Sequence, residues 1–197
     1  MNFLAHAFLS FDDPDILTGN MISDFVKGKK KFEYPQAIQQ GIKLHRLIDE
    51  FTDFHPITAN AKQFFRPAYR LYSGAFVDVV FDHFLAKDDM QFATCNGLKE
   101  FTQITYQQLE TKFVFFPGKF QMMFPYMRMQ NWLLGYRSTE GIYKSFGGLV
   151  RRSKYLRESE TAFKIFLENY KDLEQCYFAF FPELKKYAFE KLAEIKG

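Results

Sequence analysis

The side chains that could bind a metal ion or transfer a proton are concentrated in the first half of the chain. All four histidines lie within the first 83 residues, and ten of the eleven aspartates lie within the first 89. The remaining residues contain one aspartate, Asp172, and no histidine. We therefore expect a chemical site built from the first half of the chain. The four histidines are His6, His45, His55 and His83.

Several of these polar residues are spaced four positions apart. Residues four apart lie on one face of an α-helix, with about 5–6 Å between their Cβ atoms. Three helices that each offer polar ligands at this interval could converge on one site in the core of a bundle. The three groups are His45 with Asp49 and Asp53, Asp78 with Asp82 beside His83, and Asn20 with Asp24.

Asp78 and Asp82 stand in an almost wholly apolar segment, residues 75–86. A buried carboxylate costs several kcal/mol unless it is paired or bound to a cation. Two carboxylates on one face also raise each other's pKa unless a divalent metal neutralises them. Histidine and aspartate without cysteine suit a borderline or hard ion such as Mn²⁺, Mg²⁺ or Fe²⁺ better than structural zinc. Such an ion can polarise a phosphoryl oxygen and lower the pKa of a bound water.

Length and composition place the chain among ordinary globular proteins. Its 197 residues are 47% hydrophobic and 25% charged, which predicts a single domain over 1–197. The net charge of +3 is too small to indicate a nucleic-acid partner. No run approaches the roughly 18 apolar residues that cross a bilayer. Cys95 and Cys176 are far apart in sequence, so we expect reduced thiols in a cytoplasmic protein.

Hydrophobic periodicity and Gly/Pro punctuation predict an all-α fold. There is no alternation of strand and helix and no glycine-rich phosphate loop. Pro182 is expected to separate the last two helices. The expected helices are 15–27, from 36 to near 55, within 57–73 with an interruption at Pro67, 75–86, 98–113, 126–136, 157–180 and 183–195.

These residues and the blocks around them resemble one protein family along nearly the whole chain. The sequence is similar to the acyl carrier protein phosphodiesterases, a family that looks like a divergent branch of the helical HD phosphohydrolases. The usual adjacent His-Asp is missing, because Asp82 precedes His83. The matching blocks are residues 1–6, 19–28, 41–56 and 77–85, with weaker matches at 131–133 and 180–182.

The resemblance implies a reaction and a set of site residues. Activated by Mn²⁺, water would attack the phosphodiester that joins a carrier-protein serine to 4′-phosphopantetheine, giving apo-acyl carrier protein. Arg46 would clamp the phosphate, because a guanidinium can grip two phosphoryl oxygens. His6, Asp53 and His55 would orient the water or protonate the leaving serine oxygen. The implied metal ligands are drawn from Asp24, His45, Asp49, Asp78, Asp82 and His83.

Acyl carrier protein is acidic, so a basic docking face is expected. Arg151, Arg152 and Lys154 form one candidate cluster, and Lys27 to Lys31 form another; each could also be an ordinary solvated face.

Two other functions stay open at this point. One is an HD-like phosphohydrolase of a nucleotide or another small phosphate ester. The other is a non-catalytic helical binding module.

Overall fold

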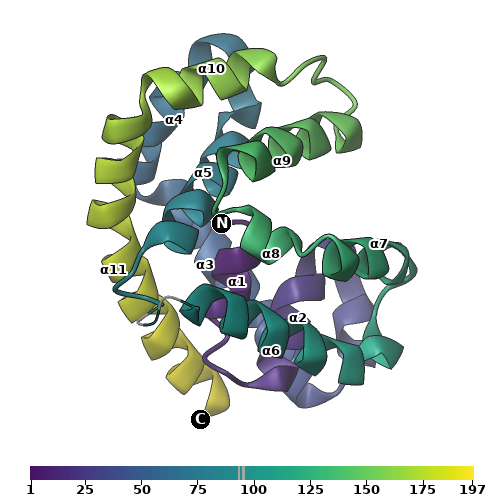
Figure 1. Cartoon of the computed structure of the whole chain (residues 1–197). Helices are drawn as coiled ribbons and strands as arrows, with labels where there is room; N and C mark the ends of the chain where they lie inside the picture. The colour runs from purple at the N-terminus through teal and green to yellow at the C-terminus, as the bar shows by residue number, and fades with distance from the viewer. Residues whose placement is uncertain (93, 95) are drawn as a thin grey trace.

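A computed structural model describes residues 1–92, 94 and 96–197, which fold into helices and connecting turns (Figure 1). Cys95 lies outside the described residues. The α-helices are α1 (Phe3–Phe8), α2 (Pro14–Ile22), α3 (Gln36–Phe54), α4 (Pro56–Tyr69), α5 (Ser73–Lys87), α6 (Gly97–Thr111), α7 (Gly118–Met129), α8 (Trp132–Gly135), α9 (Thr139–Arg152), α10 (Glu160–Glu168) and α11 (Tyr170–Lys196). The 3₁₀-helices are η1 (Ser23–Phe25), η2 (Gly28–Glu33), η3 (Arg70–Tyr72) and η4 (Phe113–Phe115).

The prediction of an all-α fold is confirmed, because the described residues contain no strand. The helices predicted over 36–55 and 75–86 correspond closely to α3 and α5. Pro67 lies inside α4, which continues to Tyr69. Arg70 follows in a conformation with φ of 47°, and this ends the helix.

The prediction that Pro182 separates two helices is wrong. α11 runs without a break from Tyr170 to Lys196 and contains Pro182. The burial of Phe180, Phe181 and Leu184 on both sides of the proline stabilises a continuous helix against the lost hydrogen bond. The chain turns earlier instead, at Asn169, whose side-chain amide donates to the carbonyl of Ile165 and so caps α10.

Two further predictions differ from the structure in the second half. The helix predicted over 126–136 is divided between α7 and α8, because Asn131 takes the left-handed conformation with φ of 45°. Its side chain then caps α8 by accepting from the backbone N–H of Leu134. In addition, α9 was not predicted, because three glycines weaken its helical signal.

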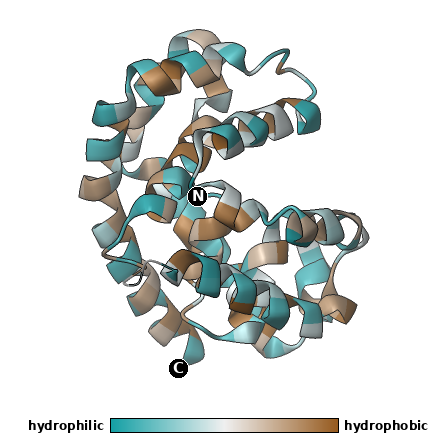
Figure 2. Cartoon of the chain, in the orientation of Figure 1, coloured by the Kyte–Doolittle hydropathy of each residue, from teal (hydrophilic) through white to brown (hydrophobic). Residues whose placement is uncertain are grey.

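A single hydrophobic core extends through the fold, and α11 lies along α3, α4 and α5 (Figure 1). Apolar residues are concentrated on the inward faces of the helices, while the outer turns are mostly polar (Figure 2). None of the helices in the described residues has both the length and the apolar character that crossing a membrane requires.

Candidate metal centre

Two glycines bring α2 and α3 into direct backbone contact. A Cβ atom at Gly19 would collide with the carbonyl oxygen of Ile38, and one at Gly41 would collide with the carbonyl oxygen of Ile16. The close approach places the end of α2 against the middle of α3, where His45 lies one turn beyond Gly41.

Asn20 lies in the last turn of α2, where backbone carbonyls have no partner within their own helix. Its carbonyl oxygen accepts a hydrogen bond from Nδ1 of His45 at 2.7 Å. Its side-chain oxygen lies 2.8 Å from Nδ1 of His6. The amide nitrogen donates to the carbonyl of His6 at 2.8 Å and to Oγ of Ser10 at 3.1 Å, which fixes the orientation of the amide. Both histidines therefore carry a proton on Nδ1.

With Nδ1 protonated, the Nε2 atoms of His6 and His45 are the available metal-binding atoms. The two rings are stacked, with centroids 3.9 Å apart. Nε2 of His6 is 3.1 Å from Oδ1 of Asp49, and Nε2 of His45 is 3.0 Å from Oδ2 of Asp49. One ligand atom from each of these three residues lies within 4.8 Å of the others. Asp24, carried by η1, places Oδ1 3.2 Å from Nε2 of His45.

The surroundings set opposite protonation states for the two rings. Burial and the positive charge of His45 lower the pKa of His6 to about 4, although Asp49 opposes the shift. Burial acts to lower the pKa of His45 as well, but hydrogen bonds to Asp24 and Asp49 raise it to about 9. Burial acts to raise the pKa of Asp49, but the Met1 α-amino group and the two histidines hold it well below its usual range. At neutral pH the Asp49 side chain is thus a carboxylate, the His6 ring is neutral and the His45 ring is a protonated imidazolium.

The three residues could together hold a metal ion. With Nδ1 protonated, the buried Nε2 of His6 can only accept a hydrogen bond, and the Asp49 oxygen 3.1 Å away cannot donate one, so this nitrogen has no hydrogen-bond partner among the described residues. A buried nitrogen without a partner is costly, and a metal ion would satisfy it. The donors are imidazole nitrogen and carboxylate oxygen, which suit Mn²⁺, Fe²⁺ and related ions. We therefore take His6, His45 and Asp49 as the candidate centre, with Asp24 beside them.

The two acidic residues of α5 have different partners. Asp78 lies 3.1 Å from the α-amino group of Met1, which is also 3.4 Å from Asp49. Asp82 instead lies under the first turn of α1. Its carboxylate accepts backbone N–H groups of Asn2, Leu4 and Ala5 at 3.3, 2.7 and 3.2 Å. The sequence suggested a metal ion as the partner of Asp82, but its hydrogen bonds are made with the N-terminus of α1, which can stabilise a buried carboxylate.

The other predicted site residues make contacts outside this group. His83 is buried, donates from Nδ1 to the carbonyl of Tyr136 at 2.7 Å and accepts at Nε2 from the hydroxyl of Tyr170 at 3.0 Å. The remaining contacts are Arg46 with the carbonyl of Val26 at 3.4 Å, Asp53 with Lys62 at 2.8 Å, and His55 with Glu183 at 3.3 Å. His55 also caps the start of α4.

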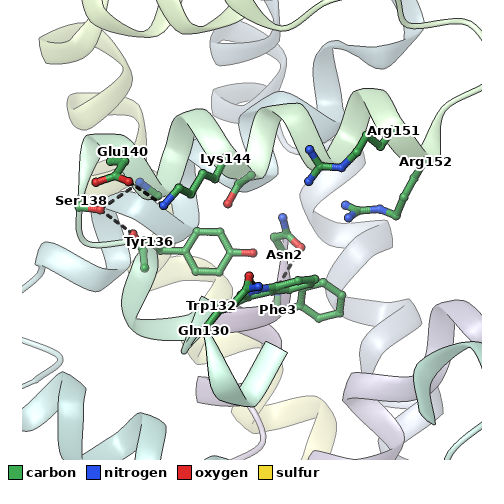
Figure 3. A pocket seen from close by; sticks show the side chains of 14 residues that line it. Asn2, Phe3, Gln130, Trp132, Tyr136, Ser138, Glu140, Lys144, Arg151 and Arg152 are labelled. Atoms are coloured by element: carbon green, nitrogen blue, oxygen red, sulfur yellow. Dashed lines mark hydrogen bonds and ion pairs between the residues drawn. The ribbon is translucent and has the colours of Figure 1, made fainter. Parts of the chain in front are cut away.

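A cavity of about 440 Å³ lies between α8 and α9, next to the N-terminus of α1 (Figure 3). Trp132 and Phe3 line one side, and Arg151 and Arg152 from the end of α9 line the other. Met1 links the cavity to the candidate metal centre, since its α-amino group contacts Asp49 and the next two residues line the cavity. The sequence contained a signal for the two arginines, as a basic cluster, but none for the cavity, because α9 was not predicted.

Comparison with known proteins identifies the family. A family model described as acyl carrier protein phosphodiesterase matches residues 1–184. Relatives described by the same words come from Photorhabdus laumondii, with 30% identity over 97% of this chain and 96% of the relative, and from Yersinia pestis, with 32% identity over 97% and 99%. A third relative, from an Enterobacter strain, is 32% identical over 93% of this chain and 95% of the relative's length. No solved structure matches the chain, so the likeness to HD phosphohydrolases stays a prediction. By the family match and these relatives, the chain belongs to the acyl carrier protein phosphodiesterase family.

Proposed function

We propose that the protein is a divalent-metal-dependent phosphodiesterase that converts holo-acyl carrier protein to the apo form and releases 4′-phosphopantetheine. The observation that carries the proposal is the convergence of His6, His45 and Asp49, with both Nε2 atoms aimed at one carboxylate. Membership of a family named for this substrate supports the choice of reaction. The metal dependence rests on the ligand geometry.

The protein's own residues would prepare and hold the site. Asn20 would keep both histidines in the tautomer that leaves Nε2 free. Bound by His6, His45 and Asp49, a divalent cation would supply a Lewis acid for a phosphoryl oxygen and for water. Arg152, which lines the adjoining cavity, would neutralise part of the phosphate charge.

Asp24 is the best placed group to accept a proton from water. Its side chain is 72% exposed and lies 3.2 Å from Nε2 of His45. The hydrogen bond to His45 holds the pKa of Asp24 below its usual value, so the carboxylate is ionised at neutral pH. An ionised, accessible carboxylate next to the candidate centre can act as a general base.

Docking of the acidic carrier protein would use the lysines of η2 together with Lys27, which directly precedes it. Lys27, Lys29 and Lys30 are exposed and follow Asp24 closely in the chain. Arg151 and Arg152 belong instead to the cavity wall. Charge reversal at Lys29 and Lys30 should raise KM for carrier protein and weaken its salt dependence, with no change for a small diester.

The test of the reaction is a mass measurement. Purified protein is loaded with Mn²⁺ and incubated with holo-acyl carrier protein and, separately, with a panel of nucleotides. We expect the carrier protein to lose the mass of its phosphopantetheine group and the nucleotides to remain intact. A metal-loaded protein that leaves the carrier protein unchanged, or cleaves only nucleotides, would contradict the proposal.

A further inference from the structure

The cavity between α8 and α9 is positively charged at one end. Arg151 and Arg152 occupy the last turn of α9 and extend along its cavity face (Figure 3). Both guanidinium groups pack close to Gly148, where a Cβ atom would be 3.3 Å from Nη1 of Arg152 and 3.8 Å from Nη2 of Arg151. Two guanidinium groups side by side form a site for a phosphate group.

The rest of the cavity offers an aromatic surface with polar groups around it. The indole of Trp132 faces the cavity and is oriented by a hydrogen bond from its Nε1 to Oε1 of Gln130 at 2.9 Å. The hydroxyl of Tyr136 points inward from a ring that is only 3% exposed, and the amide of Asn2 faces it (Figure 3). Such a lining suits a chain that alternates apolar groups with amides or hydroxyls.

The charged end lies on the side of the metal centre. Burial lowers the pKa of the Arg152 guanidinium, and the negative charge of Asp24, which contacts His45, acts against this shift. Asn2 and Phe3 line the cavity directly after Met1, whose amino group contacts Asp49. A phosphate held by Arg152 would therefore adjoin the candidate centre, and the chain attached to it would extend toward Trp132.

We propose that this cavity binds the phosphopantetheine arm of the substrate, with the phosphate at Arg151 and Arg152 and the amide-bearing chain along Trp132 and Tyr136. This inference rests on the proposed function and assigns the part of the site that selects the leaving group. The volume of about 440 Å³ is in the range of small-molecule sites, roughly 300–1,000 Å³. Arm-free phosphodiesters would leave the aromatic part of the cavity unfilled.

Binding to the cavity can be followed by fluorescence without any turnover. Trp132, which lines the cavity, is the only tryptophan in the chain and so reports on this site alone. Free 4′-phosphopantetheine is titrated into the Mn²⁺-loaded protein while the tryptophan fluorescence is followed. We expect a saturable change, and binding roughly tenfold or more tighter than that of pantetheine, which lacks the phosphate. Inorganic phosphate should compete only weakly. Equal affinity for inorganic phosphate and 4′-phosphopantetheine would overturn the inference.

Two neighbouring glycines of α9 provide a matched pair of variants. Gly148→Leu places a side chain in the cavity and should abolish the fluorescence change. Gly147→Leu gains similar helix propensity, but Gly147 does not line the cavity, and its Cβ atom would make ordinary contacts with Arg151 and Ser159. This control should bind normally. Circular dichroism and thermal unfolding confirm that both variants are folded.

Arg152→Ala keeps the inference testable if Gly148→Leu fails to fold. We expect binding of 4′-phosphopantetheine to weaken roughly tenfold or more. Unchanged binding in Arg152→Ala would overturn the inference. The proposed function is judged separately, by the mass of the carrier protein. If the protein binds 4′-phosphopantetheine but does not cleave holo-carrier protein, the proposed reaction is wrong and the cavity assignment stands. If the protein cleaves holo-carrier protein but Gly148→Leu and Arg152→Ala bind 4′-phosphopantetheine normally, the reaction stands and the cavity assignment is wrong.

Discussion

The side-chain oxygen of Asn20 accepts a hydrogen bond from Nδ1 of His6 at 2.8 Å, while the backbone carbonyl of the same residue accepts one from Nδ1 of His45 at 2.7 Å. A single buried residue thus sets the tautomer of both imidazoles in the candidate centre. The groups that orient metal-binding histidines in this way usually matter nearly as much as the ligands themselves.

Replacing Asn20 with alanine should therefore weaken metal binding. The loss of the side-chain oxygen frees the His6 ring to rotate and to change tautomer, and we expect Mn²⁺ affinity to fall by about 10–100-fold. Isothermal titration calorimetry measures this directly. Ser10→Ala is the control, because it removes a partner of the Asn20 amide and of the His6 carbonyl but leaves the bond between Asn20 Oδ1 and Nδ1 of His6 intact. An equal loss in both variants would count against the orienting role.

Two histidine variants should behave in opposite ways. His6→Ala removes a ligand nitrogen and should abolish stoichiometric Mn²⁺ binding. His83→Gln should keep the metal but lower the free energy of unfolding by about 1–3 kcal/mol, because the carbonyl of Tyr136 and the hydroxyl of Tyr170 lose a buried partner. Metal analysis and denaturant unfolding separate the two effects. Loss of metal in His83→Gln would return His83 to the ligand set.

Asp49 and Asp53 lie one turn apart on α3 and offer a second comparison. Asp49→Asn replaces the carboxylate between the two histidines with a neutral amide, and we expect turnover of holo-carrier protein to fall about 100-fold or more. Asp53→Asn removes an ion pair with Lys62 from an exposed carboxylate and should change stability by less than about 1 kcal/mol. Rates from carrier-protein mass spectra would reveal the difference. Similar losses of turnover in the two variants would show that Asp53 acts in catalysis as well as Asp49.

Metal affinity should depend on pH through His45. In the metal-free protein the pKa of His45 is about 9, because Asp24 and Asp49 outweigh the effect of burial. A metal ion needs the neutral ring, so binding below pH 9 must displace one proton. We expect affinity to rise about tenfold per pH unit between roughly pH 7 and pH 9 and then to level off. Calorimetry in buffers of different ionisation enthalpy counts the released proton. Affinity that is constant over this range would contradict the assignment of His45.

Much of the first half of the fold could be predicted from sequence, because its helices have strong apolar periodicity. α3 is an example, and the four-residue spacing of His45 and Asp49 correctly placed these two on one face. The second half was harder to predict. Glycines concealed α9, and Pro182 suggested a break that the packing of Phe180 and Phe181 prevents.

The site could be predicted only where local spacing determines it. The contact between His6 and His45 depends on how α1, α2 and α3 pack, and no sequence interval encodes it. Asp82 shows a different limit. The apolar segment around it correctly indicated a buried carboxylate, but sequence alone does not distinguish a metal ion from the N-terminus of a helix as its partner.

The contact of α2 with α3 through Gly19 and Gly41 has a consequence for the choice of ion. Backbone meets backbone there, and no flexible side chain lies between the two helices to let their spacing vary. Asn20 of α2 binds Nδ1 of both His6 and His45, so this contact also fixes where the two imidazoles lie, and the pocket between them has little freedom to widen or shrink. Such a stiff frame sorts ions by radius, so Ca²⁺, with its longer bonds to oxygen, should be excluded even where it is abundant.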